Sequence, residues 1–232
     1  MLAMKWISDL VELIFPRHCY VCGEVLSRQE HDMCLDCLYK LPKIEQKHIG
    51  EMEKVFWGKF DVERVASYIY YRKESPYNRL LHKMKYGNHP EVGSRLAIMA
   101  AENLAKEGFF DGIDAIVPLP LSKKKRRQRG YNQCDYIAEG LSHITGITVI
   151  KDCVVRTKAN ESQTHKTRDE RWKNAEGIFS LANAEAIEGK HILLIDDILT
   201  TGATLTNCAM AIQQHCKCRI SVFTLAYTYN KL

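Results

Sequence analysis

One segment, HILLIDDILTTGATL at residues 191–205, limits the fold more than any other part of the chain. Its apolar start predicts a strand at 191–195 that is buried on both faces, and a Thr/Gly turn then leads into a helix expected over 202–215. Asp196 and Asp197 follow the strand directly, and ligands of open α/β sheets bind outside the carboxyl ends of the strands. The segment therefore predicts a buried parallel strand with a ligand site at its end.

Strands and helices are expected to alternate along residues 46–232. Runs of β-branched and aromatic residues predict the strands, and a helical period of apolar residues predicts the helices. The expected strands lie at 64–71, 115–120, 147–150, 191–195 and 220–226, and the expected helices at 77–87, 91–106, 132–143 and 202–215. This alternation favours an α/β domain with a doubly wound, mostly parallel sheet.

The turn after the two aspartates has the composition of a phosphate-binding loop. Its backbone N–H groups and hydroxyls, helped by the positive end of the next helix, would hold a phosphate. The carboxylates would accept hydrogen bonds from vicinal ribose hydroxyls. The chain has no Gly-Lys-Ser/Thr and no Gly-x-Gly-x-x-Gly, which argues against a Walker site or a dinucleotide site. A simpler alternative is a polar turn that only caps a helix. It explains a single threonine or aspartate, but not the aspartate pair followed in order by the threonines and the glycine. The turn residues are Leu199, Thr200, Thr201, Gly202, Ala203 and Thr204.

Residues 1–45 are expected to form a separate module with an N-terminal helix and a metal site. Four of the nine cysteines make two Cys-x2-Cys pairs, a spacing that suits tetrahedral structural zinc, and His18 and His31 nearby leave a ligand swap open. A disulfide or a thioredoxin-like site is the alternative, but no secretory signal precedes the pairs and no strand-helix unit surrounds them. We therefore expect a cytoplasmic protein without a membrane span. The expected zinc ligands are Cys19, Cys22, Cys34 and Cys37, and the cysteines expected to fill core or surface positions are Cys134, Cys153, Cys208, Cys216 and Cys218.

The net charge of +5 is modest, but basic residues gather in one acid-free run. On charge alone such a run is a solvated loop that aids solubility. The functional alternative is single-stranded nucleic acid, because cations follow a phosphate backbone while an aromatic such as Tyr131 stacks on a base. The run consists of Lys123, Lys124, Lys125, Arg126, Arg127 and Arg129.

A long polar segment follows the short strand expected near residue 154. It has no hydrophobic period, and segments of this length inside a compact domain are usually functional lids or disordered. A lid fits a phosphate site, since closure would bring further cations to the ligand. Its polar residues include Arg156, Thr157, Gln163, Arg168, Arg171 and Asn174.

The acidic pair with its Thr-Thr-Gly turn resembles the fingerprint with which type I phosphoribosyltransferases grip phosphoribosyl pyrophosphate (PRPP). Together with the cysteine pairs, Trp57-Gly58, the stretch HKMKY at 82–86 and RGYNQ at 129–133, it makes the chain similar to the ComF family of competence-associated, GntX-like phosphoribosyltransferase-like proteins. The resemblance implies a phosphoribosyltransferase-like domain behind a zinc ribbon. It also implies PRPP as ligand, Mg²⁺ bridging the diphosphate to the ribose, and a link to DNA uptake. The polar segment is similar to that of glutamine amidophosphoribosyltransferases, but their amidotransferase domain is missing here.

The resemblance also implies roles for individual residues. Asp196 and Asp197 would bind the ribose hydroxyls and Thr200 to Thr204 the 5′-phosphate. Lys85 and Arg129 would face the diphosphate, and Arg168 would close from the polar segment as a third catalytic residue beside the aspartates.

Two functions are consistent with these roles. The chain is either a transferase that acts on an unidentified acceptor, or a non-catalytic factor of competence. That factor would sense PRPP or a nucleotide, or bind single-stranded DNA beside proteins of the competence machinery.

Overall fold

Five parallel strands form the central sheet of this protein, whose computed structural model describes residues 14–45, 49–157 and 178–228. The strands lie in the order β1-β7-β6-β2-β3, and every neighbouring pair is parallel. A separate antiparallel pair joins β4 to β5. The bounds are β1 Val65–Tyr71, β2 Ala115–Pro118, β3 Thr148–Val149, β4 Val154–Arg156, β5 Phe179–Leu181, β6 His191–Leu199 and β7 Arg219–Thr228.

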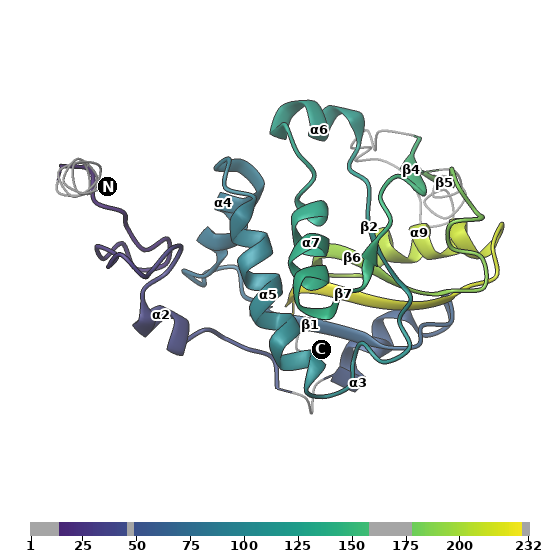
Figure 1. Cartoon of the computed structure of the whole chain (residues 1–232), viewed down its shortest axis with the longest axis horizontal. Coiled ribbons are helices and arrows are strands. Elements are labelled where there is room, and N and C mark those ends of the chain that lie inside the picture. Colours follow the sequence, from purple (N-terminus) through teal and green to yellow (C-terminus); the bar gives the residue numbers. More distant parts are fainter. Residues whose placement is uncertain (1–13, 46–48, 158–177, 229–232) are drawn as a thin grey trace.

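Helices cover both faces of this sheet (Figure 1). α5 packs against α7 and β7, and α7 also packs against β2 and β6. Because parallel crossovers are right-handed, α9, which connects β6 to β7, covers the opposite face. The bounds are α2 Leu35–Tyr39, α3 Ile49–Glu53, the 3₁₀ helix η2 Lys54–Phe56, α4 Asn78–Tyr86, α5 Glu91–Ala105, α6 Lys123–Arg129, α7 Gln133–Thr145 and α9 Ala203–Gln213.

The strand order reverses direction between β2 and β6. The chain moves outward from β2 to β3, then returns to β6 on the other side of β2 and continues to β7. A doubly wound sheet opens a crevice at the carboxyl ends of the two strands that flank such a reversal. The topology therefore places the ends of β2 and β6, with Pro118 on one and the two aspartates on the other, beside the same crevice.

The expected α/β class, with its doubly wound parallel sheet, is confirmed, and the expected strands and helices agree with the structure to within a few residues. The strand expected to end at Ile195 instead continues to Leu199, so that Asp196 and Asp197 lie inside β6. The reason is that β6 keeps pairing with β7 as far as Leu199, although its pairing with β2 ends at Ile195.

The basic run is a helix, not the loop that its charge favoured. The Ser122 hydroxyl caps α6 by accepting from the backbone N–H of Lys125, and Gly130, with φ of 81°, ends it. None of its residues is buried, so α6 extends from the body of the domain (Figure 1). This helix was missed because a run without apolar residues has no hydrophobic period to reveal it.

The N-terminal module packs beside α4 and α5 (Figure 1). Its connection to the main domain adds a short antiparallel segment to β1, because the Ile44 N–H donates to Tyr68 O and the Tyr70 N–H donates to Pro42 O. The N-terminal helix expected at the start of the chain lies outside the described residues, and the division at residue 45 stays a prediction. Among the helices the structure describes, none is long and apolar enough to cross a membrane.

Candidate functional site

A polar pocket of about 280 Å³ lies at the carboxyl ends of β2 and β6, where the topology places a crevice. Its walls come from the end of α4, the loop after β2, α6, the start of α7, the end of β4, the last part of β6 and the turn that leads into α9. The lining residues are Lys85, Tyr86, Leu119, Pro120, Leu121, Lys125, Arg129, Gln133, Cys134, Arg156, Asp196, Asp197, Ile198, Thr200 and Thr204.

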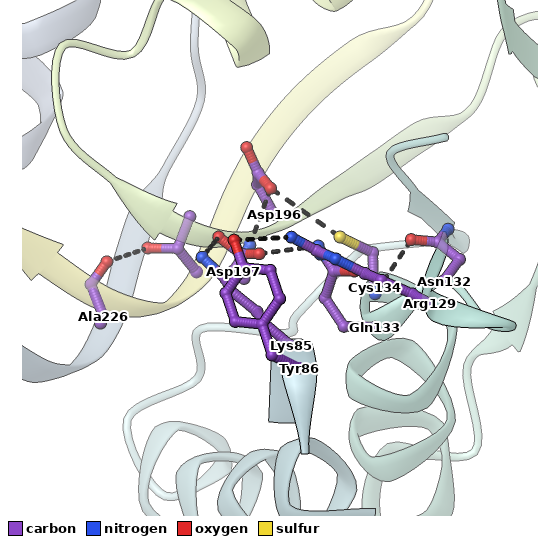
Figure 2. Close-up of polar contacts among 10 residues, drawn as sticks. Lys85, Tyr86, Arg129, Asn132, Gln133, Cys134, Asp196, Asp197 and Ala226 are labelled. Carbon is purple, nitrogen blue, oxygen red and sulfur yellow. Dashed lines mark hydrogen bonds and ion pairs between the residues drawn. The ribbon is translucent and has the colours of Figure 1, made fainter. Parts of the chain in front are cut away.

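Asp197 is held by a partner on each of its carboxylate oxygens (Figure 2). The Lys85 ammonium lies 2.9 Å from Oδ1, and the Gln133 amide donates to Oδ2 at 2.7 Å. Asp197 is buried, and both groups next to it are donors. These two contacts fix the Asp197 carboxylate between α4 and α7 in the free protein.

Asp196 has a different environment from its neighbour. Its Oδ1 accepts from the backbone N–H of Asp197 at 2.8 Å and from the thiol of Cys134 at 3.8 Å, and no cation of the described chain lies within ion-pair distance. Burial, followed by the negative charge of Asp197, raises the pKa of Asp196 from 3.8 to about 7, although the Asp197 N–H and Lys85 counteract this. The two carboxylates thus have different partners although they are adjacent in β6.

Two arginines enter the pocket without a carboxylate partner among the described residues. Arg129 donates to Gln133 Oε1 at 2.8 Å and to the Tyr86 hydroxyl at 3.3 Å, and its guanidinium lies 4.8 Å from the centre of the Tyr86 ring. Arg156 lies 5.4 Å from the Phe179 ring, and its buried Nε has no hydrogen-bond partner. Burial lowers the pKa of Arg156, which means that its charge is poorly solvated. The pocket therefore contains cations that an anion would stabilise.

The turn after β6 leaves the start of α9 open to a ligand. Gly202 begins the helix with φ of 72° and supplies no side chain to cap it, so the first N–H groups stay available for an anion. A Cβ on Gly202 would lie 2.8 Å from the Val55 side chain and 2.9 Å from that of Phe56. The close contact with η2 fixes the turn and requires glycine at this position.

The four cysteines of the two Cys-x2-Cys pairs come together in the N-terminal module. Their sulfur atoms all lie within 4.8 Å of one another, and those of Cys22 and Cys34 are 3.7 Å apart. Tetrahedral zinc with Zn–S bonds of about 2.3 Å places its sulfurs roughly 3.8 Å apart, so the arrangement fits the ion. Burial raises the pKa of Cys19, but the N–H groups of Cys22, Cys34 and Val21 outweigh it and lower that pKa to about 6, which favours a thiolate ligand.

The pocket unites most of the site residues expected from the sequence. Six of them line it: Lys85, Arg129, Asp196, Asp197, Thr200 and Thr204. Of the turn residues that do not line it, Leu199 and Gly202 are buried and Thr201 and Ala203 are exposed. Arg168 and the polar segment around it lie outside the described residues.

The basic run and Tyr131 are only partly connected with the pocket. Lys125 lines it, as Arg129 does, whereas Lys123, Lys124, Arg126 and Arg127 are exposed elsewhere on α6. Tyr131 is half-buried and its hydroxyl donates to Met84 O at 2.6 Å, so this ring has a structural role.

Three polar residues of the pocket had no role assigned from the sequence: Tyr86, Gln133 and Cys134. Gln133 is the last residue of the motif RGYNQ, and Tyr86 is the last residue of the motif HKMKY. These two motifs are the sequence signal that could have identified both residues. Cys134 was expected to be incidental, yet its thiol contacts Asp196. Arg156 was named in the sequence as the first residue of the polar segment, but its burial, with an Nε that has no hydrogen-bond partner among the described residues, is visible only in the structure.

Comparison with known proteins first defines a class. Residues 10–48 match the double zinc ribbon domain family, which confirms the expected zinc ribbon. The chain is thus a doubly wound α/β protein with an N-terminal zinc ribbon and a polar, cationic pocket at the strand reversal. It is similar in structure to a glutamine PRPP amidotransferase from Bacillus subtilis complexed with ADP and GMP, with 15% identity, a TM-score of 0.38 and coverage of 56% of this chain. The chain spans 25% of the length of that amidotransferase.

Sequence relatives then identify the family. The chain is 40% identical over 208 residues to competence protein ComFC of Bacillus subtilis, an alignment that covers 89% of this chain and 76% of the relative. It is also 28% identical over 155 residues to DNA utilization protein YhgH of Salmonella typhi, covering 62% of this chain and 67% of the relative. The chain belongs to the ComF family, as its motifs had indicated.

Proposed function

We propose that this protein binds PRPP with Mg²⁺ and transfers the phosphoribosyl group to an acceptor. The observation that carries the proposal is the pocket itself, which combines an aspartate pair, an open helix N-terminus and two arginines that have no carboxylate partner within the described part of the chain. Ribose hydroxyls would bind the aspartates, the 5′-phosphate would bind the turn at Thr200 and Thr204, and the diphosphate would face Lys85, Arg129 and Arg156. Each part of PRPP thus has a group of opposite or complementary polarity.

The chemistry would proceed by displacement at ribose C1. The acceptor forms a bond to C1, the bond from C1 to the diphosphate oxygen breaks, and pyrophosphate leaves with that electron pair while the acceptor loses a proton to solvent. Positive charge on the sugar and negative charge on the leaving group develop together, so Asp196 and Asp197 on one side and the arginines on the other would stabilise them.

Magnesium would reach this site with the ligand. Asp197 is already paired with Lys85 at 2.9 Å, which makes it a poor direct ligand, whereas Asp196 has no cation partner in the described chain. Asp196 would therefore be the protein oxygen donor available to a hard cation that prefers oxygen ligands. When bound, the cation would supply neutralisation of the diphosphate charge.

Calorimetry with PRPP and Mg²⁺ tests the proposal. Wild-type protein should bind, Asp196→Asn and Asp197→Asn should each lose at least tenfold in affinity, and Glu139→Gln should not, because Glu139 is exposed and pairs with Lys151 away from the pocket. Pyrophosphate release across a panel of bases, amines and oligonucleotides would identify the acceptor. A wild-type protein that binds no PRPP would rule out this function.

A second candidate is a non-catalytic factor that senses PRPP or a nucleotide and binds single-stranded DNA in competence. The exposed helix α6 favours it, because six of its seven residues are basic and none is buried. Oligonucleotide binding without pyrophosphate release would support this role over the transferase.

In either case we propose a cytoplasmic location, where reduced thiols would hold zinc.

A further inference from the structure

The zinc module contacts α4 through its metal-binding turns. The Arg79 guanidinium donates to Val21 O at 2.9 Å, and the Tyr77 hydroxyl donates to Cys37 O at 2.9 Å. Val21 lies between the two cysteines of the first pair, and Cys37 is itself one of the four clustered thiols. The backbone carbonyls that hold α4 therefore belong to the turns that zinc would fix.

A third contact extends this interface along the helix. The Lys83 ammonium lies 5.0 Å from the centre of the Tyr20 ring, and Tyr20 is the other residue between Cys19 and Cys22. Arg79 and Lys83 are four residues apart and so lie on one face of α4. The first cysteine turn thus contacts two successive turns of this face of α4, through Val21 and Tyr20.

The opposite end of α4 enters the pocket. Its last two residues are Lys85, whose ammonium pairs with Asp197 at 2.9 Å, and Tyr86, which carries Arg129 on its ring. The helix has only nine residues and no side-chain cap at its start. Isolated helices shorter than about 12 residues are marginal in water, so the position of α4 depends on what packs against it.

We propose that the zinc ribbon positions the pocket: its first cysteine turn and Cys37 hold α4, and α4 places Lys85 on Asp197. Tyr77 and Arg79 are then positioning residues, because they touch neither the pocket nor the metal but connect the two. This proposal depends on the proposed function only for the measurement of PRPP affinity. The placement of Lys85 is measurable in the free protein.

The test uses the full chain carrying Tyr77→Phe together with Arg79→Met, which removes both hydrogen bonds and keeps all four cysteines. Zinc content should equal that of the wild type. Lys85, whose side chain is 18% exposed in its ion pair, should be acetylated several times faster in mass-spectrometric footprinting. Amide exchange at residues 83–87 should accelerate, and PRPP affinity should fall by about tenfold, the factor expected from roughly one hydrogen bond's stabilisation.

A matched control separates this coupling from a general effect of losing a tyrosine hydroxyl and an arginine. Tyr39 is 90% exposed on α2, and Arg219 is exposed at the start of β7. Tyr39→Phe with Arg219→Met should leave Lys85 acetylation, exchange and PRPP affinity unchanged. Zinc chelation should change Lys85 acetylation and amide exchange equally in the wild type and in the control. The same treatment should change them less in the Tyr77→Phe, Arg79→Met variant, because the hydrogen bonds between the zinc module and α4 are already absent there.

The possible outcomes distinguish the two proposals. If the variant keeps its zinc and matches the wild type in Lys85 acetylation and in exchange at residues 83–87, the coupling does not exist. If the wild type binds no PRPP, the proposed function fails, while acetylation and exchange still decide the coupling. Should the double variant fail to fold, Lys83→Met, which removes only the contact with Tyr20, replaces it with the same readouts.

Discussion

Replacing Asp196 by Asn should stabilise the free protein above neutral pH while it weakens the proposed binding of PRPP. Burial raises the pKa of Asp196 from 3.8 to about 7, so between these pH values the folded chain keeps a proton that the unfolded chain has released. Unfolding is therefore favoured as pH rises through this window, and the protein loses stability. A shift of one pKa unit corresponds to about 1.36 kcal/mol, so the free energy of unfolding should fall by roughly 4 kcal/mol over the whole window. This value is an upper bound because solvent in the pocket screens the charge.

Urea unfolding at a series of pH values between about 4 and 8 measures this effect. The wild type should become less stable across the series relative to Asp196→Asn, whose amide carries no charge in either state, and the two curves should separate most at the alkaline end. Glu139→Gln, at an exposed position, should follow the wild type. Parallel curves for wild type and Asp196→Asn would refute the inference that Asp196 is a poorly solvated carboxylate.

Three other changes test separate parts of the site. Gln133→Met removes hydrogen bonds to two charged partners, each worth about 1.5–3 kcal/mol, and should lower PRPP affinity in calorimetry by at least tenfold, whereas Gln128→Met on exposed α6 should have no effect. Gly202→Ala should lower the unfolding temperature more than Gly146→Ala. Both glycines have a left-handed φ, but a Cβ at 202 meets Val55 at 2.8 Å and one at 146 meets nothing within 4 Å. Metal analysis should find about one zinc per chain in the wild type and almost none in Cys37→Ser, and equal contents would contradict the four-thiol site.

Much of the fold could be predicted because its determinants are local. The buried strand β6 is a run of apolar residues, and the alternation of strands with helices specifies the sheet class. The acidic pair and the turn after it are contiguous in sequence, as are the two cysteines of each zinc-binding pair. For these features, neighbours in the chain are also neighbours in the site.

The rest of the site could not be predicted because its contacts are not local. Gln133 reaches Asp197 across 64 positions of sequence, and the Arg129 guanidinium reaches the Tyr86 hydroxyl across 43. Helix α6 was missed for a different reason. A serine precedes it and a glycine follows it, but a helix without apolar residues has no hydrophobic period, and the charge run alone indicated a loop.

The arrangement of charges explains why two adjacent aspartates would perform different tasks. Lys85 and Gln133 already occupy both oxygens of Asp197, so this carboxylate fixes the ends of α4 and α7 relative to β6. Asp196 has no cation partner in the described chain, and burial and the charge of Asp197 raise its pKa to about 7, so its carboxyl group would be the one available to a ribose hydroxyl. Among the described residues Arg129 and Arg156 have no carboxylate partner, and an anionic ligand would relieve their unpaired charge. Because Lys85 comes from the helix that the zinc module contacts, the ion pair between Lys85 and Asp197 would depend on a metal site at the other end of that helix.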